Sequence, residues 1–253
     1  MTRPRLIIAA VAITAAVVIG GFVAYDQVLR GDSATALSLP TASSTPAAST
    51  AASASAAAPA SSPVATTGAD GGDAAGTWNV ATGSVAGYRV REQLANLPAE
   101  SDAVGRTDQV TGSITVESDG TTTTLTAADL SVDMTSLTSD ESRRDNRLRR
   151  EGLETDTFPT ATFTLTAPVE VPAAALAGTA SDVTLTGDLT LHGVTKSVQI
   201  PAQAQLVDGT IQVAGSITFP LSDYGIVAPN IGGFIVSIAD DGTLEFLVNF
   251  SKS

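Results

Sequence analysis

Apolar and polar residues alternate along most of the chain from residue 77 to its end. In "SITVE" the apolar face carries Ile114 and Val116, and in "TLEFLVNF" it carries Leu244 and Phe246. A period of two is typical of a β-strand with one buried face, because successive side chains point to opposite sides of a sheet. Threonine occupies many of the opposite positions, and "SDG", "VDG" and "DDG" separate the runs as turns would. We therefore expect about eight antiparallel strands.

Each of these strands has an apolar face that must be covered. Closing the sheet on itself covers that face and removes the exposed edges, so we predict an all-β, closed antiparallel barrel. A two-sheet sandwich is the main alternative. Many inward positions hold small or β-branched residues, such as Ala161, Ala202 and Val213, which leaves room for an apolar cavity. Tight packing of small side chains would explain the same pattern without a cavity.

The first residues of the chain form a different unit. Residues 6–24 contain no charged residue, and at about 1.5 Å per residue this run is long enough to cross a bilayer. Two arginines precede it and two aspartates follow it closely, which places the N-terminus in the cytoplasm. We predict that residues 1–32 are a cytoplasmic N-terminus and a single transmembrane anchor, with the rest extracytoplasmic. Secretion after signal cleavage is the alternative, with its nearest cleavage site at residues 34–36.

Between the predicted anchor and the alternating region, residues 33–76 are almost entirely Ala, Ser, Thr, Pro and Gly, as in "STPAASTAASASAAAPASSPVATTG". Such a composition lacks the large apolar side chains that offset the entropy of ordering a chain. We predict a disordered linker here, followed by one folded domain over residues 77–253. A flexible linker of this kind lets a domain reach away from a bilayer.

Composition argues against several classes of function. The formal net charge is −13, whereas nucleic-acid binding needs a broad positive potential. The absence of cysteine excludes disulfides, zinc–thiolate sites and thiol nucleophiles. His192 is the only histidine, so a histidine-based metal cluster is excluded, and a turn position with a hydrogen bond is favoured over a catalytic dyad with Ser197 or Asp188. We predict no metal, no catalytic residues and no enzyme activity.

Five arginines fall between Arg143 and Arg150, in a stretch that breaks the β pattern. We predict a short helix capped by Ser139 or Asp140, with Glu141 in its first turn beside the positive end of the helix dipole. The helix should end before the Phe-Pro step that follows, because proline disfavours helical backbone at the residue before it.

The faces of this helix leave three interpretations open. Arg143, Arg147 and Arg150 share one face, while Leu148 and Leu153 turn toward the sheet. The plainest interpretation is a solvated helix, laced with ion pairs, that caps one end of the barrel. The second is a contact with a lipid headgroup or pyrophosphate at the mouth of a cavity. The third is a nucleic-acid contact.

Three motifs resemble those of the YceI-like family. "RRDNRLRREGLETDTFPTATF", from Arg143, resembles the family's arginine-aspartate pair, short helix and aromatic-proline step. "LTGDLTLHGVTKSVQIP", from Leu185, is similar to its hairpin signature, and "DYGI", from Asp223, to one of its turns. The resemblance covers Trp78 to Ser253. "GYRVREQL" and "AVGRTDQVTGSITV" are similar to the form of this domain in high-GC Gram-positive bacteria, and the chain thus resembles an actinobacterial-type, membrane-anchored member.

The resemblance implies a lipocalin-like barrel with a helix set against it, whose apolar tunnel holds an isoprenoid chain, such as that of a polyprenyl lipid or a quinone. We therefore expect an extracytoplasmic module of the cell envelope that binds an amphiphilic lipid for transport, storage or envelope homeostasis, with no other cofactor. The alternative is a non-enzymatic structural or interaction protein of the envelope with a filled barrel.

Alternation selects candidate ligand-binding residues, although it cannot separate a tunnel lining from an ordinary core. The expected rim residues are Tyr88, Tyr224, Arg143 and Arg147. The expected interior residues are Met134, Phe163, Leu165, Leu185, Leu191, Ile200, Val213, Ile217, Phe219 and Phe246.

Overall fold

The computed structural model describes residues 34–40, 74–94, 100–228 and 235–253. The predicted transmembrane segment, residues 6–24, and most of the predicted linker lie outside these ranges. Within the described ranges, no helix has the length and apolar character needed to cross a membrane.

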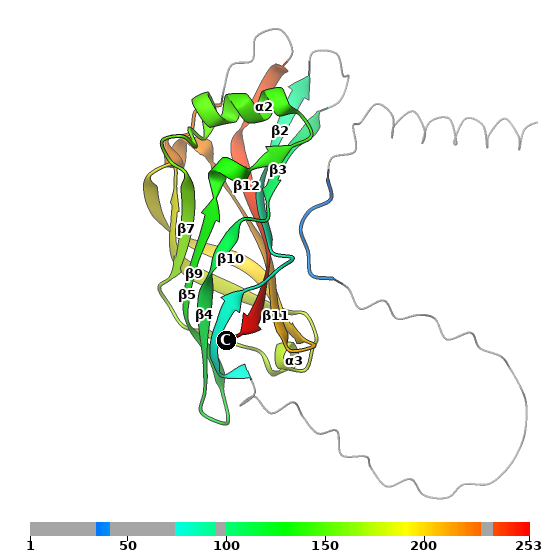
Figure 1. The fold of residues 1–253 in the computed structure, drawn as a ribbon, viewed down its shortest axis with the longest axis vertical. Coiled ribbons are helices and arrows are strands. Elements are labelled where there is room, and N and C mark those ends of the chain that lie inside the picture. The colour runs from blue at the N-terminus through cyan, green and yellow to red at the C-terminus, as the bar shows by residue number, and fades with distance from the viewer. Residues whose placement is uncertain (1–33, 41–73, 95–99, 229–234) are drawn as a thin grey trace, which may run out of the picture.

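Twelve strands account for most of the described chain (Figure 1). Five short helical segments connect them: η2 (Met134–Ser136), α2 (Ser142–Arg147), η3 (Leu148–Gly152), α3 (Ala173–Leu176) and η4 (Leu221–Tyr224). The strands are β1 (Gly76–Val80), β2 (Val85–Leu94), β3 (Ser101–Thr107), β4 (Val110–Ser118), β5 (Thr123–Asp133), β6 (Thr138–Ser139), β7 (Thr160–Leu165), β8 (Val169–Glu170), β9 (Ser181–Leu191), β10 (Val194–Val207), β11 (Thr210–Pro220) and β12 (Ile235–Lys252).

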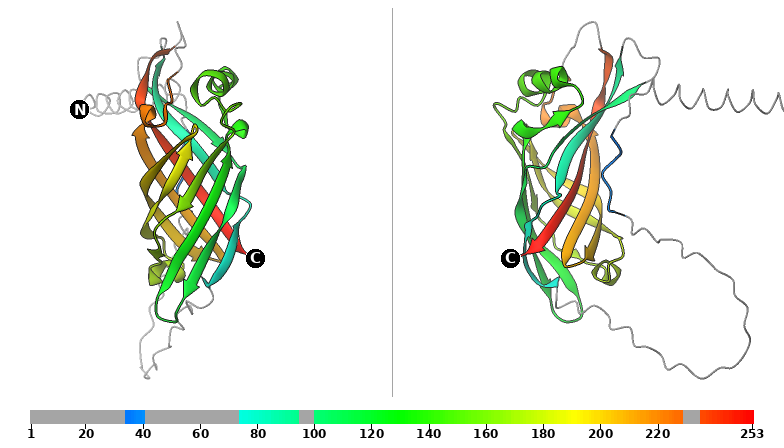
Figure 2. Two further views of the ribbon diagram at one scale, coloured as in Figure 1. Left: turned by 90° about the vertical axis from the view of Figure 1, so that its left-hand side faces the viewer. Right: turned by 45° about the vertical axis from the view of Figure 1, so that its right-hand side comes forward.

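Eight strands form a closed antiparallel ring in the order β1-β4-β5-β7-β9-β10-β11-β12. The ring closes because β12 pairs back with β1, with Trp78 opposite Lys252 and Val80 opposite Phe250. The predicted barrel is thereby confirmed, and the two-sheet sandwich is wrong. The strands run obliquely around an elongated barrel (Figure 2), as closure of a twisted sheet requires.

The long strand β12 changes partners along its length. Near its C-terminal end it pairs with β1, whereas from Ile235 to Leu247 it pairs with β2. Strand β2 pairs in turn with β3, and β3 with β6, so these strands extend the wall at the end where α2 and η3 lie (Figure 1). We call this the upper end, and the opposite end, where α3 lies, the lower end.

Two hairpins have the turns that their sequences favour. His192-Gly193, between β9 and β10, has φ values of 51° and 73°, and Asp208-Gly209, between β10 and β11, has φ values of 50° and 71°. Positive φ at both central residues suits the right-handed twist of a two-residue hairpin. The His192 ring nitrogen Nδ1 lies 3.0 Å from the Tyr224 carbonyl oxygen, so this histidine occupies the turn position, with a hydrogen bond, that the sequence favoured.

The arginine-rich stretch forms the predicted helix, with a different cap. The Glu141 side chain, and not that of Ser139 or Asp140, accepts a hydrogen bond from the first turn, from the Arg143 backbone N–H at 3.0 Å. Ser139 is instead engaged by Asp145, whose Oδ1 accepts from the Ser139 hydroxyl at 2.6 Å. Arg144 and Arg147 of this helix form ion pairs, as the first of the three interpretations expected.

Residues 34–40 and 74–76 are the described parts of the predicted linker, and Gly76 already belongs to β1. Residues 34–40 lie along the outer wall of the barrel, as the blue segment in Figure 1 shows, and Leu39 is buried there. The prediction of a disordered linker did not include these contacts of residues 34–40 with the barrel.

Candidate ligand-binding site

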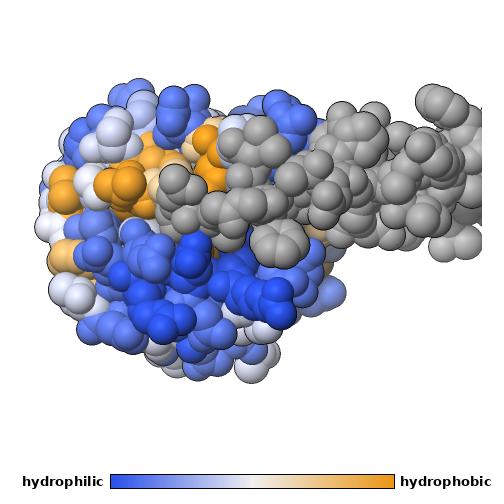
Figure 3. Space-filling model, turned by 90° about the horizontal axis from the view of Figure 1, so that it is seen from above, coloured by the Kyte–Doolittle hydropathy of each residue, from blue (hydrophilic) through white to orange (hydrophobic). Residues whose placement is uncertain are grey.

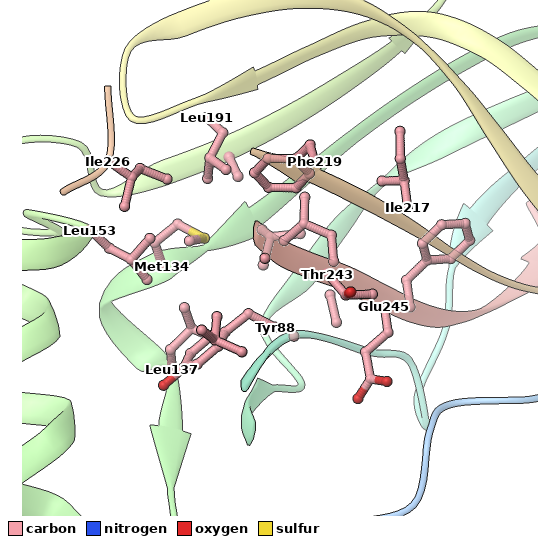
Figure 4. Close-up of a pocket in the computed structure, with 18 of the residues that line it drawn as sticks. Tyr88, Met134, Leu137, Leu153, Leu191, Ile217, Phe219, Ile226, Thr243 and Glu245 are labelled. Atoms are coloured by element: carbon pink, nitrogen blue, oxygen red, sulfur yellow. The ribbon is translucent and has the colours of Figure 1, made fainter. Parts of the chain in front are cut away.

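The upper half of the barrel encloses an apolar cavity of about 180 Å³. A single water molecule needs only about 10–15 Å³ of such space, so the cavity is an order of magnitude larger than a packing void. Side chains from β2, β5, β7, β9, β11 and β12 form its wall. Figure 4 shows Met134, Leu191, Phe219 and Ile226 converging on it from different elements.

Eight of the ten interior residues expected from the sequence line this cavity. They are Met134, Phe163, Leu185, Leu191, Ile200, Ile217, Phe219 and Phe246. Val213 lines a separate pocket of about 50 Å³ in the lower half, and Leu165 packs among side chains of both core clusters without lining either pocket. Alternation predicts which face a side chain occupies, but not its height along the barrel axis.

The four rim predictions fare differently. Tyr88 lines the cavity itself. Tyr224 is buried, with its ring edge-on to Phe219 at 4.9 Å, and does not reach the cavity. Arg143 is exposed, and Arg147 pairs with Glu151 at 3.7 Å; neither lines the cavity. The five arginines of this stretch cannot be told apart from the sequence alone, and the one that faces the barrel is Arg144.

Arg144 and Glu92 form a buried ion pair at the upper end of the cavity. Arg144 Nη2 lies 2.7 Å from Glu92 Oε1, and the Glu92 side chain is only 3% exposed. A second nitrogen of Arg144 lies 2.5 Å from Asp140. The pair joins α2 to the inner face of β2 and thus holds the helix over the barrel. Neither Glu92 nor Arg144 was expected in the site from the sequence. A glutamate within a charged strand suggests a solvent-facing position.

Tyr88 is the polar group that the cavity leaves unsatisfied. Its hydroxyl is buried and has no hydrogen-bond partner among the described residues. Burial raises the Tyr88 pKa well above its ordinary value, an effect that nearby Arg144 partly opposes. The hydroxyl is therefore protonated at neutral pH and available as a donor. Its ring lies against Gly105, where an added Cβ would fall 2.3 Å from a ring carbon.

The segment after α2 forms the roof of the cavity. Leu148, Gly152 and Leu153 line the cavity from above, and the Leu153 N–H donates to the Leu148 carbonyl in a wide π-type turn. Seen from above, apolar surface gathers beside this end of the barrel (Figure 3). Val227 contributes to the apolar surface of the molecule, with 72% of its area exposed. The upper end therefore combines an enclosed apolar interior with apolar surface outside.

The described residues include few that could form a metal or catalytic site. They contain no group of three or more metal-ligating side chains. The His192 Nε2 atom lies 3.5 Å from a Glu154 carboxylate, and neither residue lines the cavity. The geometry is that of a closed antiparallel barrel with an apolar cavity in its upper half, an arrangement that other barrels use to hold small apolar molecules.

The chain belongs to the YceI-like family, since the model of the YceI-like domain matches residues 78–250. No curated protein matches it. Among solved structures, a polyisoprenoid binding domain from Saccharophagus degradans, implicated in plant cell wall breakdown, is 23% identical with a TM-score of 0.54. That match covers 70% of this chain and 98% of the other, and it shows a shared fold.

Two further solved structures are similar to the barrel. BcnA of Burkholderia cenocepacia is 19% identical over 66% of this chain and 95% of its own, with a TM-score of 0.49. The YceI protein of Campylobacter jejuni is 18% identical over 59% of this chain and 85% of its own, with a TM-score of 0.45.

Proposed function

We propose that this protein is a binding module that holds an amphiphilic isoprenoid, or a similar lipid, in the upper half of its barrel. The observation that carries the proposal is the apolar cavity of about 180 Å³ that the side chains leave unfilled. The similar domain from Saccharophagus degradans is described as polyisoprenoid-binding, which supports the same class of ligand here. The alternative of a filled barrel fits the lower half of the molecule only.

An isoprenoid suits this wall because its affinity would come from buried hydrocarbon. Each buried CH₂ contributes roughly 0.8 kcal/mol, so one five-carbon unit contributes up to about 4 kcal/mol before the costs of ordering. Branched methyl groups would meet leucine, isoleucine and phenylalanine side chains along the wall.

The polar end of the cavity favours a neutral headgroup over a phosphate. Tyr88 offers an unpaired hydroxyl donor beside the hydrocarbon wall. Arg144 is already paired with Glu92 and Asp140, so the positive charge near this end is neutralised. Among the described residues that line the cavity, Arg144 is the only cation, so a buried phosphate would have no unpaired cation in the cavity wall, whereas a quinone carbonyl or an alcohol needs only one hydrogen bond.

We propose further that the barrel works outside the cytoplasm, attached to the cell membrane by residues 6–24. The support comes from the uncharged run and from the arginines that precede it. A module attached in this way would receive its lipid from the adjacent bilayer, in transport, storage or envelope homeostasis. Protease treatment of intact cells would test the location: cleavage of the barrel supports it, and protection contradicts it.

The test of lipid binding uses the full chain and three probes: geranylgeraniol, geranylgeranyl diphosphate and a short-chain quinone. We expect the alcohol and the quinone to bind, and the diphosphate to bind at least tenfold more weakly. Native mass spectrometry of gently purified protein should also show a copurified lipid.

A matched pair of variants on β7 tests the location of the site. Ala161→Phe places a ring in the cavity and should abolish binding, whereas Thr164→Phe places the same ring on the exposed face and should leave binding unchanged. Equal affinity of the Ala161→Phe variant and the native protein for all three probes would overturn the proposed site.

A further inference from the structure

A cluster of charged side chains lies on the outer wall of the barrel. Glu245 on β12 and Arg106 on β3 both lie opposite Gly87 on β2, which separates them. Because Gly87 has no side chain, the two charged groups meet across it, with 2.7 Å between Arg106 Nη2 and Glu245 Oε1. Arg89, on the same face of β2, lies 3.6 Å from Glu245 Oε2 and 3.0 Å from Asp102.

The side chain of Glu245 is more deeply buried than is usual for a charged side chain on the outer wall of a barrel. This side chain is 3% exposed. Glu245 borders the cavity, as do the flanking residues Leu244 and Phe246. In Figure 4 its carboxylate points away from the other labelled side chains, toward the side where the blue ribbon of residues 34–40 passes. A carboxylate withdrawn from water is stable only when it is paired and hydrogen-bonded.

Residues 34–40 cover Glu245 and its two arginine partners, and they contact these side chains through backbone atoms. Arg89 Nη2 donates to the Ala34 carbonyl at 2.6 Å, and Arg106 Nη2 donates to the Thr35 carbonyl. The Leu37 N–H donates to Glu245 Oε2 at 3.4 Å. Two cationic donors thus meet two carbonyls, and one anionic acceptor meets an N–H. This complementarity fixes one register of an extended chain.

Side chains add a sequence requirement to this backbone recognition. Leu39 is 7% exposed and Leu37 is half-buried, whereas Ala36 and Ser38, on either side of Leu37, are exposed. Residues 33–76 contain no other leucine, and Val64 is their only other large aliphatic residue. The leucines of the predicted linker therefore coincide with the segment that contacts the barrel.

We propose that Arg89, Arg106 and Glu245 form a peptide-binding site on the outer wall, which we call the clamp, and that its ligand is the extended segment 34–40 of the same chain. The clamp recognises backbone carbonyls at two successive positions and an N–H two residues later, with leucine favoured at 37 and 39. It attaches the N-terminal part of the chain to the side of the barrel, and it works whether or not the cavity holds a lipid.

Hydrogen–deuterium exchange of the full chain tests the clamp. We expect the amides of residues 36–39 to exchange at least about tenfold more slowly than those of residues 47–57, which have a similar small-residue composition. The Leu37→Ser/Leu39→Ser variant should lose this protection while the barrel strands keep theirs. Val64→Ser is the matched control within the predicted linker and should change nothing.

The barrel side of the clamp is tested by Arg106→Ala and by Arg89→Ala/Arg106→Ala, both of which should release residues 36–39. If the barrel strands lose protection as well, the two leucine substitutions decide the question, because they leave the barrel sequence intact. Equal, fast exchange of residues 36–39 in the native chain and in the leucine variant would overturn the proposal. Protection that disappears on dilution would mean that a second copy supplies the segment, which would overturn the intramolecular assignment.

Discussion

The upper and lower halves of the barrel are built from the same strands but are packed differently. In β12, Phe250 is 2% exposed and belongs to the lower core cluster with Trp78. About 14 Å of strand separates Phe250 from Phe246, at about 3.4 Å per residue, and Phe246 lines the open cavity together with Leu244. The strand β12 thus contributes side chains both to the packed lower core and to the wall of the upper cavity.

The difference shows that a single alternating pattern serves two purposes. The lower half encloses only about 50 Å³ of open space, against about 180 Å³ above. Burial of large side chains such as Trp78, whose Nε1–H is satisfied by the Ala74 carbonyl at 2.9 Å, stabilises the lower half. An open cavity forgoes such contacts. We infer that stability is concentrated below and binding capacity above, and the following changes test this division.

The largest effect is expected from Phe250→Ala, compared with Phe246→Ala. The first removes a fully buried ring and should lower the free energy of unfolding by about 3–5 kcal/mol. The second removes a ring that already borders open space, so its cost should be smaller, while the affinity for geranylgeraniol should fall. Urea unfolding and lipid titration of both variants measure the two effects. Equal destabilisation would contradict the division.

Next in size is Arg144→Ala, compared with Arg143→Ala one residue earlier in α2. Removing Arg144 leaves Glu92 buried without its cation, which should cost about 3 kcal/mol, whereas the exposed Arg143 should cost less than about 0.5 kcal/mol. Thermal unfolding measures both. A small effect of Arg144→Ala would mean that α2 is not held down by the ion pair. Glu92→Gln combined with Arg144→Ala should recover part of the loss.

The two hairpin turns provide a third contrast between the ends. Gly209→Ala places a side chain at positive φ in open space and should cost about 1 kcal/mol. Gly193→Ala adds a Cβ only 2.6 Å from the Phe158 ring, so its cost should be roughly 2–3 kcal/mol. Chemical denaturation of both variants gives the comparison. Equal values would show that the Phe158 ring moves aside freely.

The smallest effect is a pH dependence at Tyr88. Because burial raises the pKa of Tyr88 in the folded protein, the unfolded chain loses this proton first, starting near the ordinary value of 10. Stability from this group is fully present below pH 10 and falls by about 1.4 kcal/mol for each pH unit above it. Tyr88→Phe should remove this part of the alkaline loss. Identical stability profiles of the two proteins between pH 9 and 11 would contradict the burial of the hydroxyl.

The sequence was sufficient for much of this structure. A period of two predicts the strands and their inward faces, and the need to cover those faces predicts closure. The turns at His192-Gly193 and Asp208-Gly209 follow from residues that tolerate positive φ. These features are local, or depend on one simple requirement of burial.

Other features depend on partners that are distant in the sequence. Glu92 and Arg144 meet only because β2 and α2 come together at one end of the barrel. Leu165 and Val213 lie at heights that alternation does not specify. The signal for residues 34–40 was present in the two leucines of the predicted linker, but recognising it required the charged groups on the outer wall.

The clamp also determines how far the barrel can travel from an attachment point at residue 24. If residues 6–24 span the membrane as proposed, residues 25–33 connect the membrane to the engaged clamp, and a chain of this length reaches at most about 30 Å when fully extended. Release would add residues 34–73 to this connection and raise its maximum extended length to about 170 Å. Formation or release of this one peptide contact would then change the distance that the barrel can reach from the bilayer surface.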